Sequence, residues 1–151
     1  MALPSASQSR FIHARRVARL ASADASGCPH LIPICFVLDD EQIYVTIDQK
    51  PKRGSPLKLK RLANIQVNPK VAVVVDHYSE DWGRLGWVML RGCAEILLGG
   101  DEHALAQRLL KTRYRQYQSM QLSELPVIAV RITKVTSWGD LSTEASREEV
   151  D

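Results

Sequence analysis

The chain has few cysteines and no long apolar run, and each scarcity excludes a class of protein. Its three cysteines, Cys28, Cys35 and Cys93, are an odd number without a CxxC pair, so we expect no disulfide framework and a reduced, cytoplasmic protein. No apolar run approaches the roughly 18–20 residues that a membrane-spanning helix needs. Residues 1–10 are small and polar without an apolar centre, so no secretory signal is predicted there.

Common catalytic and metal-binding motifs are also missing. The sequence contains no GxGxxG, GxxxxGK[ST] or GxSxG pattern, which excludes the standard dinucleotide, P-loop and serine-hydrolase signatures. The four histidines, His13, His30, His77 and His103, are far apart, and none has a second His or Cys at ligand spacing. We therefore expect no metal site and assign no residue to nucleophilic catalysis.

The composition itself is that of an ordinary globular protein. The 151 residues are 45% hydrophobic and 25% charged, values typical of one domain that buries its core without disulfides or metals. We assign residues 11–140 to this domain, residues 1–10 to a flexible N-terminus and residues 141–151 to an acidic C-terminal tail.

The first part of the chain is expected to form an antiparallel meander after a short helix or early strand at residues 11–19. Asp, Gly and Glu clusters supply the turns, because Asp can bond its own backbone and Gly accepts a positive φ. Pro29 and Pro33 lack a backbone donor, so their strand should lie at an edge or carry a bulge. The turns fall at residues 24–27 and 39–41, and the strands at residues 17–23, 29–38 and 42–47.

The second part is expected to add two helices and three strands. Ser55 and Pro56 provide an N-cap and a first helical residue, and Asn68-Pro69 ends that helix. The continuous β-branched run at residues 71–75 is typical of a strand buried on both faces. Later elements are expected as a long strand or a bent pair at 85–98, broken by Gly86 and Gly92, then a helix at 101–117 and a strand at 126–135. The element order predicts a mainly β protein, a closed antiparallel barrel with helices at its rim.

Positive charge is concentrated in one stretch, which we call the basic segment. No acidic residue occurs between Asp48 and Asp76, and the rest of the chain has 13 basic and 17 acidic residues. The seven cations of the segment are Lys50, Lys52, Arg53, Lys58, Lys60, Arg61 and Lys70. A solvated surface would explain them, and so would a phosphate ester bound at a helix N-terminus. A nucleic-acid backbone is less favoured, because no Phe, Tyr or Trp lies between Lys50 and Lys70 for bases to stack on.

Several short motifs, in this order and spacing, resemble the pyridoxamine-5′-phosphate-oxidase-like FMN-binding split-barrel superfamily. Within it they resemble the branch of probable coenzyme F-420 (deazaflavin)-dependent enzymes, over roughly residues 11–140. The motifs are Ala14–Ser22, Asp24 and Gly27, Pro29–Pro33, Lys50–Arg53, Leu59–Leu62, Asn64-Ile65, Asn68–Val71, Val75–Tyr78, Asp81-Trp82, Leu85 and Trp87-Val88.

The resemblance implies a split-barrel homodimer that binds coenzyme F-420 or FMN in a cleft at the subunit interface. The residues that match a phosphate site are Lys50, Lys52, Arg53, Lys58 and Lys60. The strand with Ile32, Pro33 and Ile34 would run beside the tricyclic ring, and Trp87 and Trp138 would contact the ring or the dimer seam; core packing is the alternative for both tryptophans.

The implied activity is an oxidoreductase that transfers a hydride from the reduced cofactor to a small organic substrate. His77 and Tyr78 could donate a proton or serve only as structural hydrogen-bonding groups. Two other functions remain open: a cofactor-binding protein without turnover, for storage or sensing, and a nucleic-acid-binding barrel. The vitamin-oxidising activity of pyridoxamine-5′-phosphate oxidase itself is not expected. The acidic residues 144–151 do not match the C-terminal substrate-binding segment of that enzyme.

Overall fold

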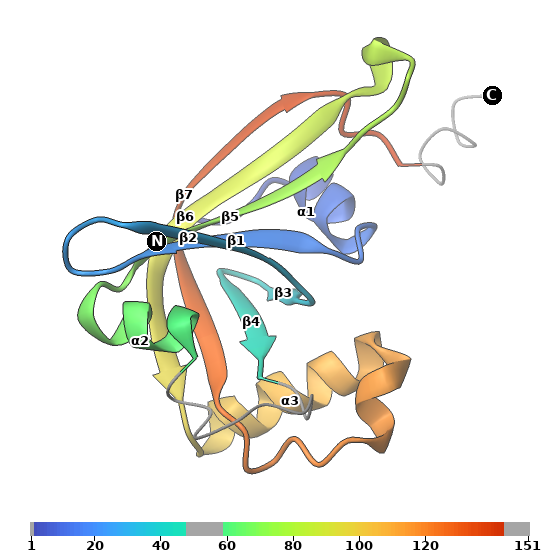
Figure 1. Ribbon diagram of the computed structural model, residues 1–151. Helices are drawn as coiled ribbons and strands as arrows, with labels where there is room; N and C mark the ends of the chain where they lie inside the picture. The colour runs from blue at the N-terminus through green and yellow to red at the C-terminus, as the bar shows by residue number, and fades with distance from the viewer. Residues whose placement is uncertain (1, 48–58, 144–151) are drawn as a thin grey trace.

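A computed structural model describes residues 2–47 and 59–143, in which seven strands form one antiparallel sheet. The strands are β1 (Ala18–Ala23), β2 (Pro29–Ile34), β3 (Val37–Asp39), β4 (Gln42–Thr46), β5 (Lys70–His77), β6 (Gly86–Leu97) and β7 (Val127–Gly139). Their order in the sheet is β2-β1-β5-β6-β7-β4-β3, and every neighbouring pair is antiparallel. The strongly curved sheet is half of a barrel (Figure 1).

The strand order confirms a split barrel but shows that the simple meander and the closed barrel were wrong. Strands β2 and β3 follow one another in the chain yet occupy the two ends of the sheet order. The intervening places are taken by later strands, because β1 pairs with β5 and β4 pairs with β7. The edge position expected from Pro29 and Pro33 is confirmed for β2.

Three α-helices flank the sheet: α1 (Ala6–His13), α2 (Lys60–Val67) and α3 (Asp101–Arg113). Helix α1 is fixed by a capping box between Ser5 and Gln8, so it begins inside the segment that we expected to be flexible. Helix α2 ends at Asn68, as predicted, whereas its predicted start at Ser55 lies outside the described residues. None of the described helices is both long enough and apolar enough to span a membrane.

The C-terminal end of α3 comes four residues earlier than expected, at Arg113 rather than at residue 117. Tyr114 takes an extended backbone there, and a short 3-10 helix, η3 (Arg115–Ser119), follows. The Tyr114 hydroxyl explains the break, because it hydrogen-bonds the main chain of Phe36 and Arg16. Such a buried network holds the chain away from helical geometry.

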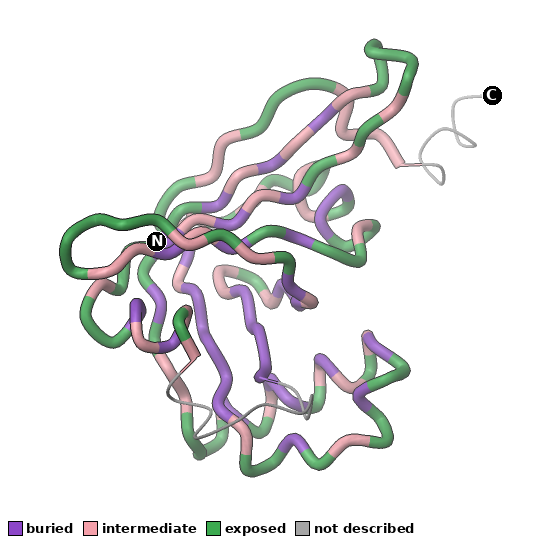
Figure 2. The backbone as a smooth tube through the Cα atoms, viewed as in Figure 1, coloured by how far each residue is buried: buried purple, intermediate pink, exposed green. Residues whose placement is uncertain are grey.

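Burial divides the sheet into an inner and an outer face. The inner face packs a hydrophobic cluster to which α1 contributes Phe11 and Ile12 and α2 contributes Leu62 and Ile65. The outer face of β4 and of the first part of β7 packs on α3 in a second cluster. Figure 2 shows the alternation of buried and more exposed residues along β5 and β6 where no helix covers the outer face.

Because only one face of β5 is covered, the expectation that residues 71–75 form a strand buried on both faces was wrong. Strand β5 buries Val71, Val73 and Val75 but leaves Ala72 and Val74 half-buried on the outer face. The β-branched run is therefore a strand with one buried face, and the side chains on its other face lie outside the hydrophobic core.

A β-bulge lies at the point where α3 begins to cover the outer face of the sheet. The register of β6 against β7 shifts between Arg91 and Gly92. A Cβ at position 92 would clash with the backbone carbonyl of Arg131, so only glycine fits this close approach. Beyond the bulge, Ala129 and Val127 of β7 pack in the cluster beneath α3.

A charged cluster joins α3 to the sheet. The Arg131 guanidinium donates to the Glu102 carboxylate and to Glu95, and the Tyr44 hydroxyl donates to Glu102 at 2.7 Å. The hydrogen bonds from Arg131 are the main reason that the pKa of Glu102 falls to about 2. Burial, followed by the contact with Glu102, raises the pKa of Tyr44 above its ordinary value.

Glu102 should make the stability of the fold sensitive to acid. Because its pKa is lower in the folded protein, the carboxylate stabilises the fold above its ordinary pKa of 4.5, and this contribution is lost as the pH falls towards about 2. We expect Glu102→Gln to reduce the free energy of unfolding at neutral pH and to flatten its decline between about pH 5 and pH 3. Urea unfolding at several pH values measures both effects. Glu124→Gln, at an exposed position before β7, is the matched control; an equal change in that variant would contradict the assignment.

Candidate functional site

The basic segment reaches the described structure at the first residue of α2. Lys60 is exposed there, with 56% of its side chain accessible, and its Nζ lies 4.0 Å from Oδ2 of Asp24. The other four residues assigned to a phosphate site, Lys50, Lys52, Arg53 and Lys58, lie outside the described residues. The structure therefore places one cation of the predicted set, on α2 beside the turn between β1 and β2.

Asp24 is mainly a turn residue rather than a partner that neutralises Lys60. Its Oδ1 accepts hydrogen bonds from Ser26 N, Ser26 Oγ and Cys28 N. The hydrogen bond from the Ser26 side chain is the largest cause that lowers the Asp24 pKa, and the charge of Lys60 is the smallest. An exposed pair at 4.0 Å is weak, so Lys60 can bind another anion.

Strand β2 presents its predicted ring-contact residues in two directions. Ile34 is 6% exposed and belongs to the inner cluster, and Ile32 packs against the same cluster. Pro33 points to the outer face and is exposed. Of the three residues, Pro33 and the edge of the strand are therefore the parts open to a ligand, whereas Ile34 is a core residue in this chain.

A buried polar group lies between β2 and α2. His30 pairs in register with Ser22 of β1, and the Ser22 hydroxyl accepts a hydrogen bond of 3.2 Å from Asn64 of α2. The Nδ1 atom of His30 is buried and has no hydrogen-bond partner among the described residues. A buried ring nitrogen without a partner is unusual, and it adds an unsatisfied polar atom to the region between β2 and α2.

Trp87 and Trp138 lie together at the other end of the sheet. They are direct partners in the β6–β7 register and share the outer face. Trp138 is 54% exposed. Trp87 is half-buried and lines a groove of about 360 Å³ with Val74, Met89 and the Arg19–Asp76 ion pair.

These residues are part of a larger outer surface without a helix over it, which we call the open face. Register places Pro33, Arg19, Val74, Met89 and Thr136 in one row across five strands. The apolar members of the open face are Leu31, Pro33, Val74, Trp87, Met89 and Trp138. The Arg19–Asp76 ion pair lies between Pro33 and Val74 in this surface, and exposed apolar residues gathered in this way are typical of interaction sites.

Within one chain, the tryptophans and Lys60 are far apart. Asp24, the neighbour of Lys60, follows the end of β1 at Ala23, whereas Trp87 lies beyond the beginning of β1 at Ala18. A strand of this length extends about 17 Å at roughly 3.3 Å per residue. The two sets also lie on different faces of the sheet, because α2 packs on the inner face and both tryptophans are on the outer face.

His77 and Tyr78 belong to a different cavity, of about 720 Å³, between α1, the end of β5 and residues 142–143. Arg10, Arg15 and Arg84 also line it. Sequence reasoning missed these arginines as a group, because Arg10 and Arg15 come from α1 and the residues just after it, whereas Arg84 comes from a distant segment between β5 and β6. Only the folded chain brings them together.

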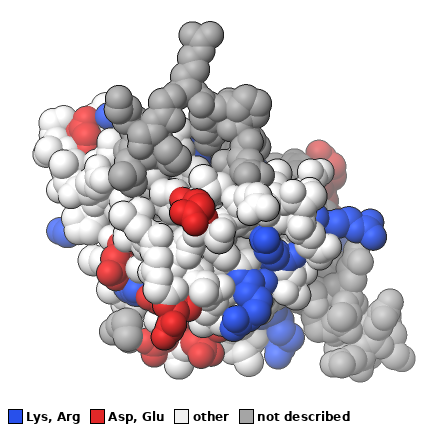
Figure 3. Space-filling view, turned by 90° about the horizontal axis from the view of Figure 1, so that it is seen from below, with Lys and Arg blue, Asp and Glu red and all other residues white. Residues whose placement is uncertain are grey.

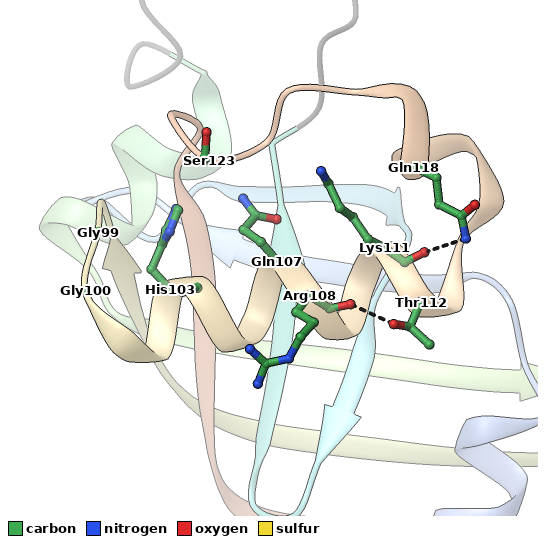
Figure 4. A pocket seen from close by; sticks show the side chains of 10 residues that line it. Gly99, Gly100, His103, Gln107, Arg108, Lys111, Thr112, Gln118 and Ser123 are labelled. Carbon is green, nitrogen blue, oxygen red and sulfur yellow. Dashed lines mark hydrogen bonds between the residues drawn. The ribbon is translucent and has the colours of Figure 1, made fainter.

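A further groove of about 620 Å³ runs along α3 (Figure 4). Gln107 points from α3 into it, and its Nε2 donates to Thr46 Oγ1, Leu122 O and Leu125 O. His103 lies 2.7 Å from the same Leu125 carbonyl. These hydrogen bonds connect α3 to the segment before β7 and to the end of β4. We therefore interpret Gln107 and His103 as structural residues.

Charge on the neighbouring surface follows the direction of α3. The first turn of the helix is acidic, with Asp101 and Glu102, and its last turn is basic, with Lys111 and Arg113, as the helix dipole favours. Figure 3 shows that acidic and basic side chains gather on different sides of the molecule seen from below. Among residues 2–47 and 59–143, no three His, Cys, Asp or Glu side chains meet in a way that could hold a metal ion.

The region from Lys60 to His30 fits a ligand that combines an anionic group with a polar ring. Lys60 supplies a cation at a helix N-terminus, and helix N-termini favour anions. His30 adds a buried nitrogen without a partner, and β2 adds a free strand edge. Among these features, the cation at the N-terminus of α2 and the edge of β2 are the ones open to an anionic ligand.

Comparison with known proteins gives the same fold and one catalytic relative. The profile of the pyridoxamine 5′-phosphate oxidase family matches residues 6–139. A 5a,11a-dehydrotetracycline/5a,11a-dehydrooxytetracycline reductase of Streptomyces rimosus is 31% identical over 94 residues, which are 61% of this chain and 63% of that protein. The aligned region thus spans less than two thirds of the reductase.

Solved structures show the fold over most of the chain. A conserved hypothetical protein of Mycobacterium tuberculosis has a TM-score of 0.74 at 17% identity, covering 92% of this chain and 86% of the other. An FAD-binding protein of Mesorhizobium loti has a TM-score of 0.65 at 24% identity, covering 90% and 95%. Because the family profile extends from α1 to the end of β7, this chain belongs to the pyridoxamine 5′-phosphate oxidase family.

Proposed function

We propose that this protein is an oxidoreductase that uses reduced coenzyme F-420, or alternatively FMN, to reduce a small organic substrate. The observation that carries the proposal is the basic segment, acid-free from residue 49 to 75, whose cation Lys60 begins α2 beside the edge strand β2. A phosphate group at this helix N-terminus would meet concentrated positive charge.

The comparisons support reduction as the reaction type. The match to a dehydrotetracycline reductase covers 94 residues at 31% identity, and an FAD-binding protein has a similar fold. A storage or sensing protein would use the same pocket without turnover. We favour catalysis because the curated relative is a reductase.

In this proposal the cofactor supplies the hydride, and the chain binds, orients and shields the reacting groups. Lys60, with Lys50, Lys52, Arg53 and Lys58, holds the phosphate. The edge of β2 and the outward residue Pro33 lie beside the ring. No residue is assigned as a proton donor.

A second copy of the chain completes the cleft. Trp87 and Trp138 are on the open face, about the length of β1 away from Lys60, and a symmetric dimer uses the same surface twice. In that arrangement the tryptophans of one protomer contact the cofactor held by its partner, or seal the seam beside it. The apolar open face is the surface that such a dimer would bury.

Cofactor identity has a direct spectroscopic test. Protein purified from a host that makes both cofactors should show the deazaflavin band if F-420 is bound and flavin bands if FMN is bound. Addition of an electron acceptor to the reduced complex should then change the spectrum as the cofactor is oxidised. A colourless protein that binds neither cofactor on titration would refute the proposal, and binding without turnover would favour the storage or sensing function.

Lys60→Ala should weaken FMN binding about 10- to 150-fold, because a charge-assisted hydrogen bond contributes about 1.5–3 kcal/mol. Against riboflavin, which lacks the phosphate, the loss should largely vanish. Isothermal titration with both ligands measures the difference. Lys70→Ala is the matched control: Lys70 is exposed and belongs to the same basic segment, but it lies past the C-terminal end of α2. Equal losses with FMN and riboflavin would show that Lys60 does not hold the phosphate.

Trp138→Arg should separate the proposed dimer, because a charge on the open face cannot be buried without a partner. We expect wild-type protein to sediment at about twice 16.9 kDa and the variant at about 16.9 kDa. Leu98→Arg alters another large exposed apolar residue, 62% accessible and outside the open face, and should leave the mass unchanged. A monomeric wild-type protein that binds cofactor tightly would argue against a shared cleft.

A further inference from the structure

The cavity that contains His77 and Tyr78 has a composition unlike that of the other grooves. Three arginines, Arg10, Arg15 and Arg84, and two histidines, His13 and His77, line about 720 Å³ of space. The remaining described lining residues are Ala14, Tyr78, Ser79, Ser142 and Thr143. None of these described lining residues is acidic, and the exposed arginines Arg10 and Arg84 bring positive charge to the rim of the cavity.

Arg15 is held in place by contacts on three sides. Its guanidinium lies 4.9 Å from the centre of the Phe11 ring, and its Nη1 lies 2.9 Å from Nδ1 of His77. Its backbone carbonyl accepts a hydrogen bond from Arg113, which also donates to the His13 carbonyl. A cation fixed in this way loses little conformational entropy when it binds an anion.

The contact between Arg15 and His77 determines which ring nitrogen of His77 can donate a hydrogen bond to a ligand. A guanidinium only donates, so His77 Nδ1 must accept, and a neutral ring then carries its proton on Nε2. Burial, followed by the charge of Arg113, lowers the pKa of His13, which favours the neutral form of that ring. Positive charge in the cavity thus comes from arginines, which stay charged at every physiological pH.

Arg10 and Arg84 are at exposed positions in the lining. Arg84 lies 4.0 Å from Asp81 in an exposed pair, which leaves most of its charge available. Arginine forks match the geometry of carboxylate and phosphate oxygens. The volume exceeds that of a simple ion and falls within the usual range of small-molecule sites, about 300–1,000 Å³.

We propose that this cavity is a second ligand site, for a small organic anion bearing a carboxylate or a phosphate. It is separate from the basic segment, because its residues come from α1, the end of β5, the 3-10 helix η2 (Trp82–Arg84) and the residues after β7. Arg10 and Arg84 bind the anion from the rim of the site, and the hydroxyl groups of Tyr78 and Ser79 hydrogen-bond it. Arg15 lies at the base, where it contacts Phe11 and His77.

Amide NMR of the full-length protein, titrated at constant ionic strength, tests the proposal with inorganic phosphate and malonate as probes. We expect saturable shifts at residues 77–79, 84 and 142 with at least one probe, and the probe that saturates identifies the anionic group. The double variant Arg10→Gln/Arg84→Gln should weaken that binding about tenfold or more. Arg15 is left intact, because its contacts with Phe11 and His77 support the fold.

Two controls make the outcomes decisive. Arg108→Gln/Arg115→Gln removes the same charge from exposed positions on α3 and η3 and should leave the affinity unchanged. Lys60→Ala should also leave it unchanged while weakening FMN binding. Shifts that do not saturate, or equal losses in both double variants, would mean general attraction to a cationic surface and would overturn the proposal. A loss in Lys60→Ala alone would place the anion at the basic segment and would overturn it as well.

Discussion

The structure depends on the fact that α3 covers only part of the outer face of the sheet. The bulge at Gly92 shifts β6 against β7, and beyond it Val127 and Ala129 are buried beneath α3. Arg131 then lies outward, where its guanidinium binds Glu102 of α3. Before the bulge nothing in the described chain covers the same face. The single bulge thus separates a structural half of the sheet from an open half that remains free for interaction.

Local features of the fold could be predicted from the sequence, and long-range pairing could not. Pro29 and Pro33 predicted an edge strand because proline lacks a donor, and the Asn68-Pro69 end of α2 was equally local. The partners of β1 and β4 are distant in sequence, so hydrophobic patterning gave no sign of them. The run at residues 71–75 was misjudged because β-branched residues suit a strand whether one or both faces are buried.

The same distinction applies to the charged sites. The basic segment is continuous in sequence, so its missing acids could be counted directly. The cavity that contains His77 and Tyr78 is also lined by Arg10, Arg15 and Arg84. In the sequence, each of these arginines looks like an ordinary surface residue. The signal of this cavity is the folded geometry, above all the Arg15–His77 contact at 2.9 Å. The structure locates Lys60, Ile32, Pro33, Ile34, Trp87 and Trp138, whereas Lys50, Lys52, Arg53 and Lys58 lie outside the described residues. The role of all ten as cofactor contacts stays a prediction.

These placements bear on how a cofactor cleft would be built. Ile34 is committed to the inner core, so β2 can present only its edge and its outward residues to a ring. Lys60 and Trp138 lie near opposite ends of β1, and α2, which begins at Lys60, packs on the inner face of the sheet, whereas Trp138 is on the outer face. In the proposed dimer the two residues that contact one cofactor therefore come from different protomers. In the proposed dimer, a symmetric partner would cover the exposed apolar surface around Trp138 and bring its own tryptophans to the cofactor held by Lys60.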